Sequence, residues 1–226
     1  MGVVMKKIIC TIPLQISDRA LEKVVYDVLD NKKLEYKGAV SFPIISVING
    51  YVEKGEKIEI LVLQQAAEGT DSNYIDFQKQ VSRLCNRKNI KCMYKVIDIV
   101  FDESSGTHLK TFLALIENIE EKDDLYACMT YGTKPIPIVE MMALNYAYRN
   151  LRQVHVGCIV YGQKSWKKNT HVIYDITSLF VMDEVVHEFT NYIAVNDCYN
   201  LDDVIYTKLH DYMDLGVEQD GKILFF

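Results

Sequence analysis

Short apolar runs alternate with longer segments whose apolar residues recur at helical spacing, and this alternation constrains the fold more than any other feature of the chain. Strands separated by helices of ordinary length are typical of a parallel sheet, because parallel neighbours need a crossover between them. The strands predicted in this way cover residues 7–12, 58–63, 91–100, 125–129, 154–161 and 172–174.

The segments with helical periodicity fill the intervals between these strands. They cover residues 17–29, 42–52, 72–86, 107–119, 136–148, 175–194 and 202–212. The last two strands are joined only by a short turn around Trp166, which favours an antiparallel pair. We therefore expect an α/β fold with a Rossmann-like, doubly wound, mostly parallel sheet and an antiparallel C-terminal edge hairpin. Residues 1–195 would form this domain, and residues 196–226 a short C-terminal extension.

Length and charge limit the functions open to this fold. A chain of 226 residues with 49% apolar residues suffices for one α/β domain with a real core. Its net charge of −6 argues against a protein that binds duplex nucleic acid over a broad basic surface. A site for an anionic ligand would therefore have to be local.

The cysteines and the apolar runs bear on location and on metal binding. The six cysteines are scattered without a CxxC pair, which favours buried thiols in a reducing cytoplasm. No apolar run reaches the length of a membrane span, and the N-terminus leads into a strand rather than a signal peptide. Cys85, Cys92 and His108 are poorly spaced for zinc, so we expect neither a metal nor a cofactor.

The segment from residue 124 to residue 137 carries the most chemistry. An apolar strand runs into a turn with the sequence TYGTK and then into a helix, and such turns meet ligands beyond the carboxyl ends of parallel strands. Helix N-termini favour anions, so Thr130, Thr133 and Lys134 are placed to meet phosphate. Tyr131 would present a flat ring to a base.

A structural interpretation of the same turn stays open. Thr133 would then cap the helix, Pro135 and Pro137 would set its first turn, and Lys134 would be a solvated charge. The turn matches neither the phosphate-binding P-loop nor the three-glycine dinucleotide motif.

The first predicted strand ends in a similar polar turn, which contains Thr11, Pro13 and Gln15. If this strand and the strand at residues 125–129 are neighbours in the sheet, both turns open onto one crevice. The sequence alone does not determine whether these two strands are neighbours.

The order of these motifs resembles the CRISPR-associated Rossmann-fold family, known as CARF domains. The resemblance is carried by MTYGTKPIP at residues 129–137 with the helix that follows, by VHVGCIVYG at residues 154–162, and by IYDIT at residues 173–177. It covers roughly the second half of the chain, with which the first half is compatible.

The resemblance implies a homodimer that binds a cyclic oligoadenylate, the second messenger of type III CRISPR antiviral defense, across the dimer axis. Carried over residue by residue, Thr11, Pro13 and Gln15 match the first turn of the family, and Thr130, Gly132, Thr133 and Lys134 match the second. Where close family members often have arginine, this chain has Lys134, which offers a point charge in place of a bidentate fork. The helix at residues 136–148 and the C-terminal aromatics are candidates for the dimer interface.

Three functions follow from these observations. The protein would be a sensor module that signals to an effector domain or a partner chain. Alternatively, it would be a metal-independent ring nuclease that cleaves the messenger by attack of a ribose 2′-hydroxyl, with Lys134 and Thr133 as catalytic residues. A flavodoxin-like protein with an ordinary mononucleotide is the third interpretation.

Overall fold

The structure is a computed structural model that describes residues 4–14, 21–164 and 170–196. The chain divides into two compact units, Met1–Asp175 and Ile176–Phe226. The first unit contains the sheet, and the second contains helix α5 (Thr177–Asn196). The helix expected at residues 202–212, the turn at Trp166 and the extension expected after residue 195 lie outside the described residues. The predicted domain boundary therefore stays a prediction.

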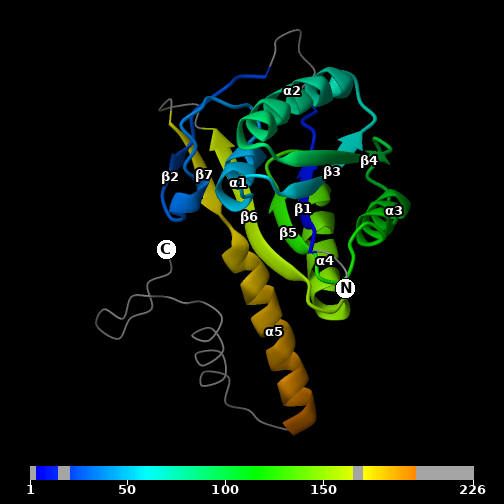
Figure 1. Cartoon of the computed structure of the whole chain (residues 1–226). Coiled ribbons are helices and arrows are strands. Elements are labelled where there is room, and N and C mark those ends of the chain that lie inside the picture. Colours follow the sequence, from blue (N-terminus) through cyan, green and yellow to red (C-terminus); the bar gives the residue numbers. More distant parts are fainter. Residues whose placement is uncertain (1–3, 15–20, 165–169, 197–226) are drawn as a thin grey trace. The chain divides into compact units, whose positions relative to one another are not determined.

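The first unit is an α/β fold with one sheet of seven strands in its described part, in the order β2-β7-β6-β5-β1-β3-β4 (Figure 1). All pairs in the sheet are parallel except β6 and β7, which are antiparallel. This arrangement confirms the predicted fold class. The strands are β1 (Lys6–Thr11), β2 (Asp27–Val28), β3 (Lys57–Gln65), β4 (Lys91–Ile99), β5 (Asp124–Cys128), β6 (His155–Lys164) and β7 (His171–Asp175).

Helices cover both faces of the sheet. One face of β1 presents Ile8, Cys10 and Ile12 to the core that α1 and α2 close. The opposite face lies against α3 and α4, which pack on each other (Figure 1). The helical elements of this unit are η1 (Lys32–Leu34), α1 (Ile44–Tyr51), α2 (Thr70–Lys88), α3 (Ser105–Ile116) and α4 (Pro135–Asn150).

The strand order puts the reversal of winding direction at β1. From β1 the chain builds β3 and β4 on one side, and it then crosses over to build β5, β6 and β7 on the other. The loops after β1 and β5 therefore diverge from two neighbouring strands, which is where ligands bind in open α/β sheets. β1 and β5 are neighbours in the sheet, which the sequence had left undetermined.

One predicted element is wrong. The segment expected as a helix up to Leu29 is extended over its described residues, with a bridge from Val24 to Val40 and strand β2 beside β7. Val24 and Tyr26 are buried, whereas Val25 and Leu29 are exposed. The apolar residues therefore alternate with a period of two, and β-branched valines fit that pattern. Because β2 pairs with β7, the antiparallel pair β6–β7 lies one strand inside the sheet, and β2 forms the edge that we expected the pair to form.

Candidate functional site

The site is built around the loop between β5 and α4, residues 129–134. Gly132 lies at the centre of this loop with a φ of 97°, a left-handed conformation that favours glycine. A Cβ atom there would lie 2.9 Å from Thr11 Cγ2. The end of β1 and the loop after β5 therefore touch at a point where no side chain fits.

Thr130 ties this loop to the neighbouring strand. Its Oγ1 accepts a hydrogen bond of 2.8 Å from the Gly162 amide of β6. It also lies 3.1 Å from Cys128 Sγ. The hydroxyl expected to meet phosphate thus already accepts a backbone hydrogen bond, although it retains a second lone pair.

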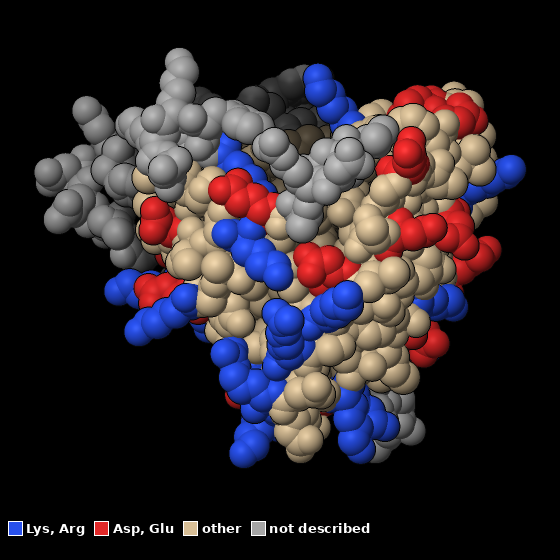
Figure 2. Space-filling view, turned by 90° about the horizontal axis from the view of Figure 1, so that it is seen from above, with Lys and Arg blue, Asp and Glu red and all other residues tan. Residues whose placement is uncertain are grey.

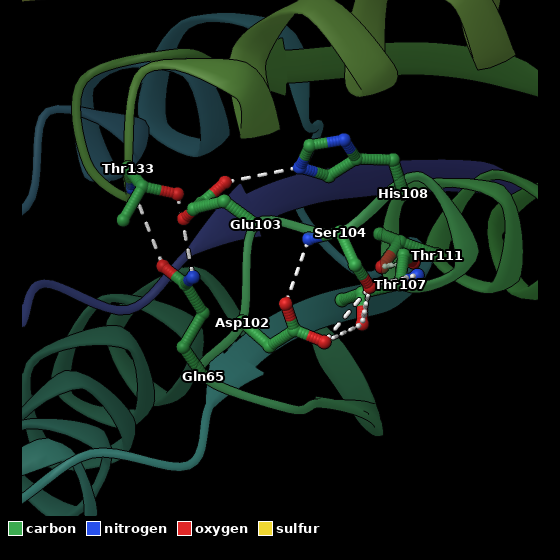
Figure 3. A network of polar contacts seen from close by, with 8 residues as sticks. All are labelled: Gln65, Asp102, Glu103, Ser104, Thr107, His108, Thr111 and Thr133. Atoms are coloured by element: carbon green, nitrogen blue, oxygen red, sulfur yellow. Dashed lines mark hydrogen bonds and ion pairs between the residues drawn. The ribbon is translucent and has the colours of Figure 1, made fainter.

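Thr133 is held by a buried amide at the end of β3. Gln65 is 1% exposed, and its Oε1 accepts from the Thr133 amide at 3.3 Å. Gln65 Nε2 in turn donates to Thr133 Oγ1, also at 3.3 Å. Figure 3 shows both contacts, which fix the backbone and the side chain of Thr133 together.

An acidic residue accepts a hydrogen bond from the same hydroxyl. The hydrogen bond from the Thr133 side chain, followed by one from His108, lowers the pKa of Glu103. His108 Nε2 lies 3.0 Å from Glu103 Oε2, so the carboxylate connects Thr133 to a histidine on α3 (Figure 3). Next to this pair, Ser104 caps α3 through the Thr107 amide, and Asp102 accepts from Ser104. A glutamate and a histidine therefore lie beside the loop expected to bind phosphate.

Lys134 directly precedes α4 and is exposed. Among the described residues it forms no ion pair, so its charge is available to an anion. Pro135 and Pro137 lack backbone N–H groups, and the Ile136 amide donates to the Thr133 carbonyl. The helix N-terminus thus offers fewer donors than a generic one, and Lys134 gains importance as the positive group.

The first turn contributes less directly than we expected. Thr11 is 2% exposed, and its Oγ1 donates to Glu140 Oε1 at 2.8 Å. Pro13 is buried, and its carbonyl accepts from Asn73 Nδ2 of α2 at 2.8 Å. Gln15 lies outside the described residues. Thr11 and Pro13 therefore support the loop, and direct contact of either with a ligand stays a prediction.

Tyr131 packs against the protein in this structure. Its hydroxyl donates to the Ser41 carbonyl at 2.5 Å, and its ring meets Phe42 edge-on with centroids 6.2 Å apart. Burial raises the pKa of the Tyr131 hydroxyl well above its ordinary value. The expected stacking on a base stays a prediction, and one edge of the ring is already occupied.

Glu140, like Gln65 and Glu103, is a residue of this region that sequence reasoning missed. It lies on α4 among the buried residues Val139, Ala143 and Leu144, and it is 0% exposed. Burial raises its pKa to about 8, although the hydrogen bond from Thr11 acts in the opposite direction. A carboxylate on the apolar stripe of a predicted helix was the feature in the sequence that could have revealed it.

Charges on the carboxyl-end face of the sheet are mixed. Figure 2 views the molecule from this side: acidic side chains are more frequent at the right of the view and basic ones at its lower centre. The face is not a uniform basic surface, so attraction of an anion depends on few groups. Among the described residues, no three potential metal-ligating side chains converge, and no helix is long and apolar enough to cross a membrane.

Comparison with known proteins leaves the family open. No family model matches the chain, and no curated protein matches it. The resemblance to CARF domains therefore stays a prediction that rests on the motifs themselves.

Proposed function

We propose that the protein binds a cyclic oligoadenylate at the crevice between the ends of β1 and β5, as a sensor module of type III CRISPR antiviral signalling. The observation that carries the proposal is the adjacency of these two strands at the point where the sheet reverses its winding direction. The loop after β5 supplies a left-handed glycine, two threonines and a lysine that forms no ion pair within the described part of the chain.

Lys134 is the central positive group of the proposal. It is exposed at the start of α4, whose dipole also favours negative charge. A charge-assisted contact with phosphate is about twice as strong as a neutral hydrogen bond. Lys134 would therefore account for much of the affinity, and the binding would weaken with added salt.

The apolar face that α3 and α4 expose supports the proposal of a homodimer. Ile138 and Met142 on α4 are 62% and 56% exposed, and Leu109 on α3 is 58% exposed. The rings of Phe112 and Tyr146 are 5.7 Å apart, so the apolar stripes of the two helices adjoin. Lys134, Ile138 and Met142 follow one another at intervals of four residues, so a two-fold axis through this face would bring both copies of Lys134 near one ligand.

Calorimetry with purified protein tests the binding. We expect cyclic tetra- or hexaadenylate to bind to the wild type and to bind at least tenfold more weakly to Lys134→Ala. Lys57→Ala, which removes an exposed lysine at the opposite end of the sheet, is the matched control and should bind like the wild type. Equal affinity of all three proteins would refute the site. Binding of a mononucleotide alone would favour the flavodoxin-like interpretation.

Light scattering tests the dimer. The wild type should be a dimer at micromolar concentration, and Ile138→Asp should be a monomer, because it introduces a charge into the apolar face. A monomeric wild type, with and without ligand, would contradict the proposed assembly.

The Glu103–His108 pair favours a second candidate function, that of a ring nuclease. Cleavage requires a group to take the proton of the attacking 2′-hydroxyl and one to protonate the departing 5′-oxygen. A histidine paired with a carboxylate 3.0 Å away is suited to proton transfer, and it lies beside Thr133. The products would be a 2′,3′-cyclic phosphate and a free 5′-hydroxyl.

Chromatography of labelled ligand after incubation separates the two functions. A nuclease returns linear products, and His108→Ala should then bind the ligand but cleave it at least a hundredfold more slowly. A sensor returns the ligand intact with both proteins.

A further inference from the structure

Glu140 has a buried carboxyl group that is only half satisfied. Its Oε1 accepts the hydrogen bond from Thr11, whereas its Oε2 is buried and has no hydrogen-bond partner among the described residues. Buried side-chain oxygens are rarely left without a partner in folded proteins, and each exception calls for an explanation. A proton on the carboxyl group would remove its charge and so lower the cost of leaving this oxygen without a partner.

The surroundings of the carboxyl group favour its uncharged form. From β1 it meets Thr11, whereas Cys10 and Cys128 lie on the opposite face of the sheet. Burial, and to a smaller extent the charge that Glu140 would carry, raises the pKa values of both thiols. No Lys, Arg or His among the described residues acts on the pKa of Glu140. A charge here would therefore be uncompensated in a region of low dielectric.

The position of Glu140 links this proton to the loop. Glu140 holds the hydroxyl of Thr11, and the methyl group of Thr11 lies against Gly132, where even one added carbon atom would come within 2.9 Å. Any displacement of Thr11 is therefore transmitted to the loop that ends at Lys134. Helix side chains also point toward the N-terminus of their helix, which directs the carboxyl group of Glu140 toward the base of the loop.

We propose that Glu140 is the proton-carrying positioning residue of this crevice: its uncharged form holds Thr11 and the loop in place for an anionic ligand, and loss of its proton drives that ligand off. The inference rests on the proposed function, because it requires that a phosphate group binds at the loop. It adds a regulation by pH that the family resemblance does not imply.

The expected pH dependence follows from linkage. A bound phosphate repels a negative charge at Glu140, so the complex retains the proton more strongly than the free protein. The affinity should be constant below pH 8, where the free protein is already protonated, since burial raises the pKa of Glu140 to about 8. Above this pH it should fall by about tenfold per unit, until the pKa of the complex is reached.

Calorimetric titrations from about pH 6 to about pH 9.5 test the proposal, with cyclic tetra- or hexaadenylate as the probe, whichever binds more tightly to the wild type. Glu140→Gln retains the shape of the side chain and its hydrogen bond to Thr11 but carries no charge at any pH. We expect its affinity to equal that of the wild type below pH 8 and to stay constant above it. Glu140→Met is also uncharged but cannot hold Thr11, so its affinity should be several-fold lower and equally independent of pH.

The outcomes are distinguishable. If the wild type and Glu140→Gln lose affinity in parallel above pH 8, Glu140 is a structural residue and the inference is wrong, while the proposed function stands. If the wild type binds neither messenger at any pH, the proposed function fails and the inference fails with it. A decline confined to the wild type supports both.

Discussion

The two ends of β1 carry buried polar groups on the same face of the sheet but satisfy them differently. At the amino end, Lys7 is 6% exposed and donates hydrogen bonds of 2.8 Å to both Glu59 and the Asn118 carbonyl. Asp123 lies 3.5 Å away. At the carboxyl end, four residues along the same strand, the Thr11–Glu140 pair has one hydrogen bond and one orphaned oxygen.

Charge balance separates the two ends further. Burial alone would lower the pKa of Lys7, but the hydrogen bond to Glu59 and the charge of Asp123 outweigh it and raise the pKa. The pKa of Asp123 is also raised, because its burial outweighs the hydrogen bond from the Glu120 amide and the charge of Lys7. At Glu140 no cation of residues 4–14, 21–164 and 170–196 offsets the burial.

This difference shows which buried polar group belongs to the scaffold and which belongs to a site. A cluster whose members complete one another's hydrogen bonds has nothing left to offer a ligand. An incompletely satisfied group at the ligand-binding end of a parallel sheet remains available for a proton and for a neighbouring anion.

The largest expected effect concerns the amino end. Lys7→Met should lower the free energy of unfolding by about 3–5 kcal/mol, because it leaves Asp123 and Glu59 without their cation. Urea denaturation measures the loss, and the exposed Lys57→Met control should stay within about 0.5 kcal/mol of the wild type. A loss below about 1 kcal/mol would mean that the cluster at the amino end is not a structural support.

The second prediction concerns the stability at the carboxyl end. Between its ordinary pKa of 4.5 and about 8, Glu140 is ionised in the unfolded chain but protonated in the folded one. Wild-type stability therefore falls as the pH rises through this range, by about 1.4 kcal/mol per unit. Glu140→Gln lacks this slope and should gain up to roughly 4 kcal/mol on the wild type between about pH 5 and about pH 8. Parallel stability curves would show that Glu140 is ionised in the folded protein.

The third prediction tests the contact between the loop and Thr11. Gly132→Ala should lower the free energy of unfolding by about 2–3 kcal/mol, because it combines a left-handed backbone with a clash against Thr11. Gly55 also has a positive φ, of 89°, but an added Cβ there meets nothing within 4 Å. Gly55→Ala should therefore lose only about 1 kcal/mol. If thermal denaturation shows equal losses for Gly132→Ala and Gly55→Ala, the close approach of Thr11 to Gly132 does not contribute to stability.

The smallest expected effect concerns the rim of the crevice. Glu103→Gln should bind cyclic oligoadenylate about threefold more tightly, because it removes an exposed negative charge beside the loop and weakens the competition for the Thr133 hydroxyl. Glu117→Gln, an exposed glutamate at the end of α3, should leave the affinity unchanged. Weaker binding by Glu103→Gln would indicate that Glu103 contacts the ligand directly, for example by accepting from an amino group.

The local pattern of the sequence determined most of the elements of the first unit and the fold class. Apolar runs and helical periodicity predicted β1, β3, β4, β5 and β6 together with α1 to α4, because the residues of each element face one common environment. The segment 17–29, which includes β2, was wrongly predicted as a helix, since Leu21, Val24 and Val28 fit a helical period as well as an extended chain. Its pairing with Val40 and with β7, which is distant in the sequence, decided the outcome.

At the site, the sequence determined the loop with Thr130, Gly132, Thr133 and Lys134, because turn residues and the start of a helix are local features. Only the tertiary structure decided what these residues contact. Gln65 at the end of β3 and Glu103 before α3 are distant from the loop in the chain but contact Thr133, and Glu140 of α4 meets Thr11 of the neighbouring strand β1. Whether a hydroxyl is free or engaged, and whether a carboxyl group keeps its proton, depends on burial and on partners distant in the chain, which no local pattern encodes.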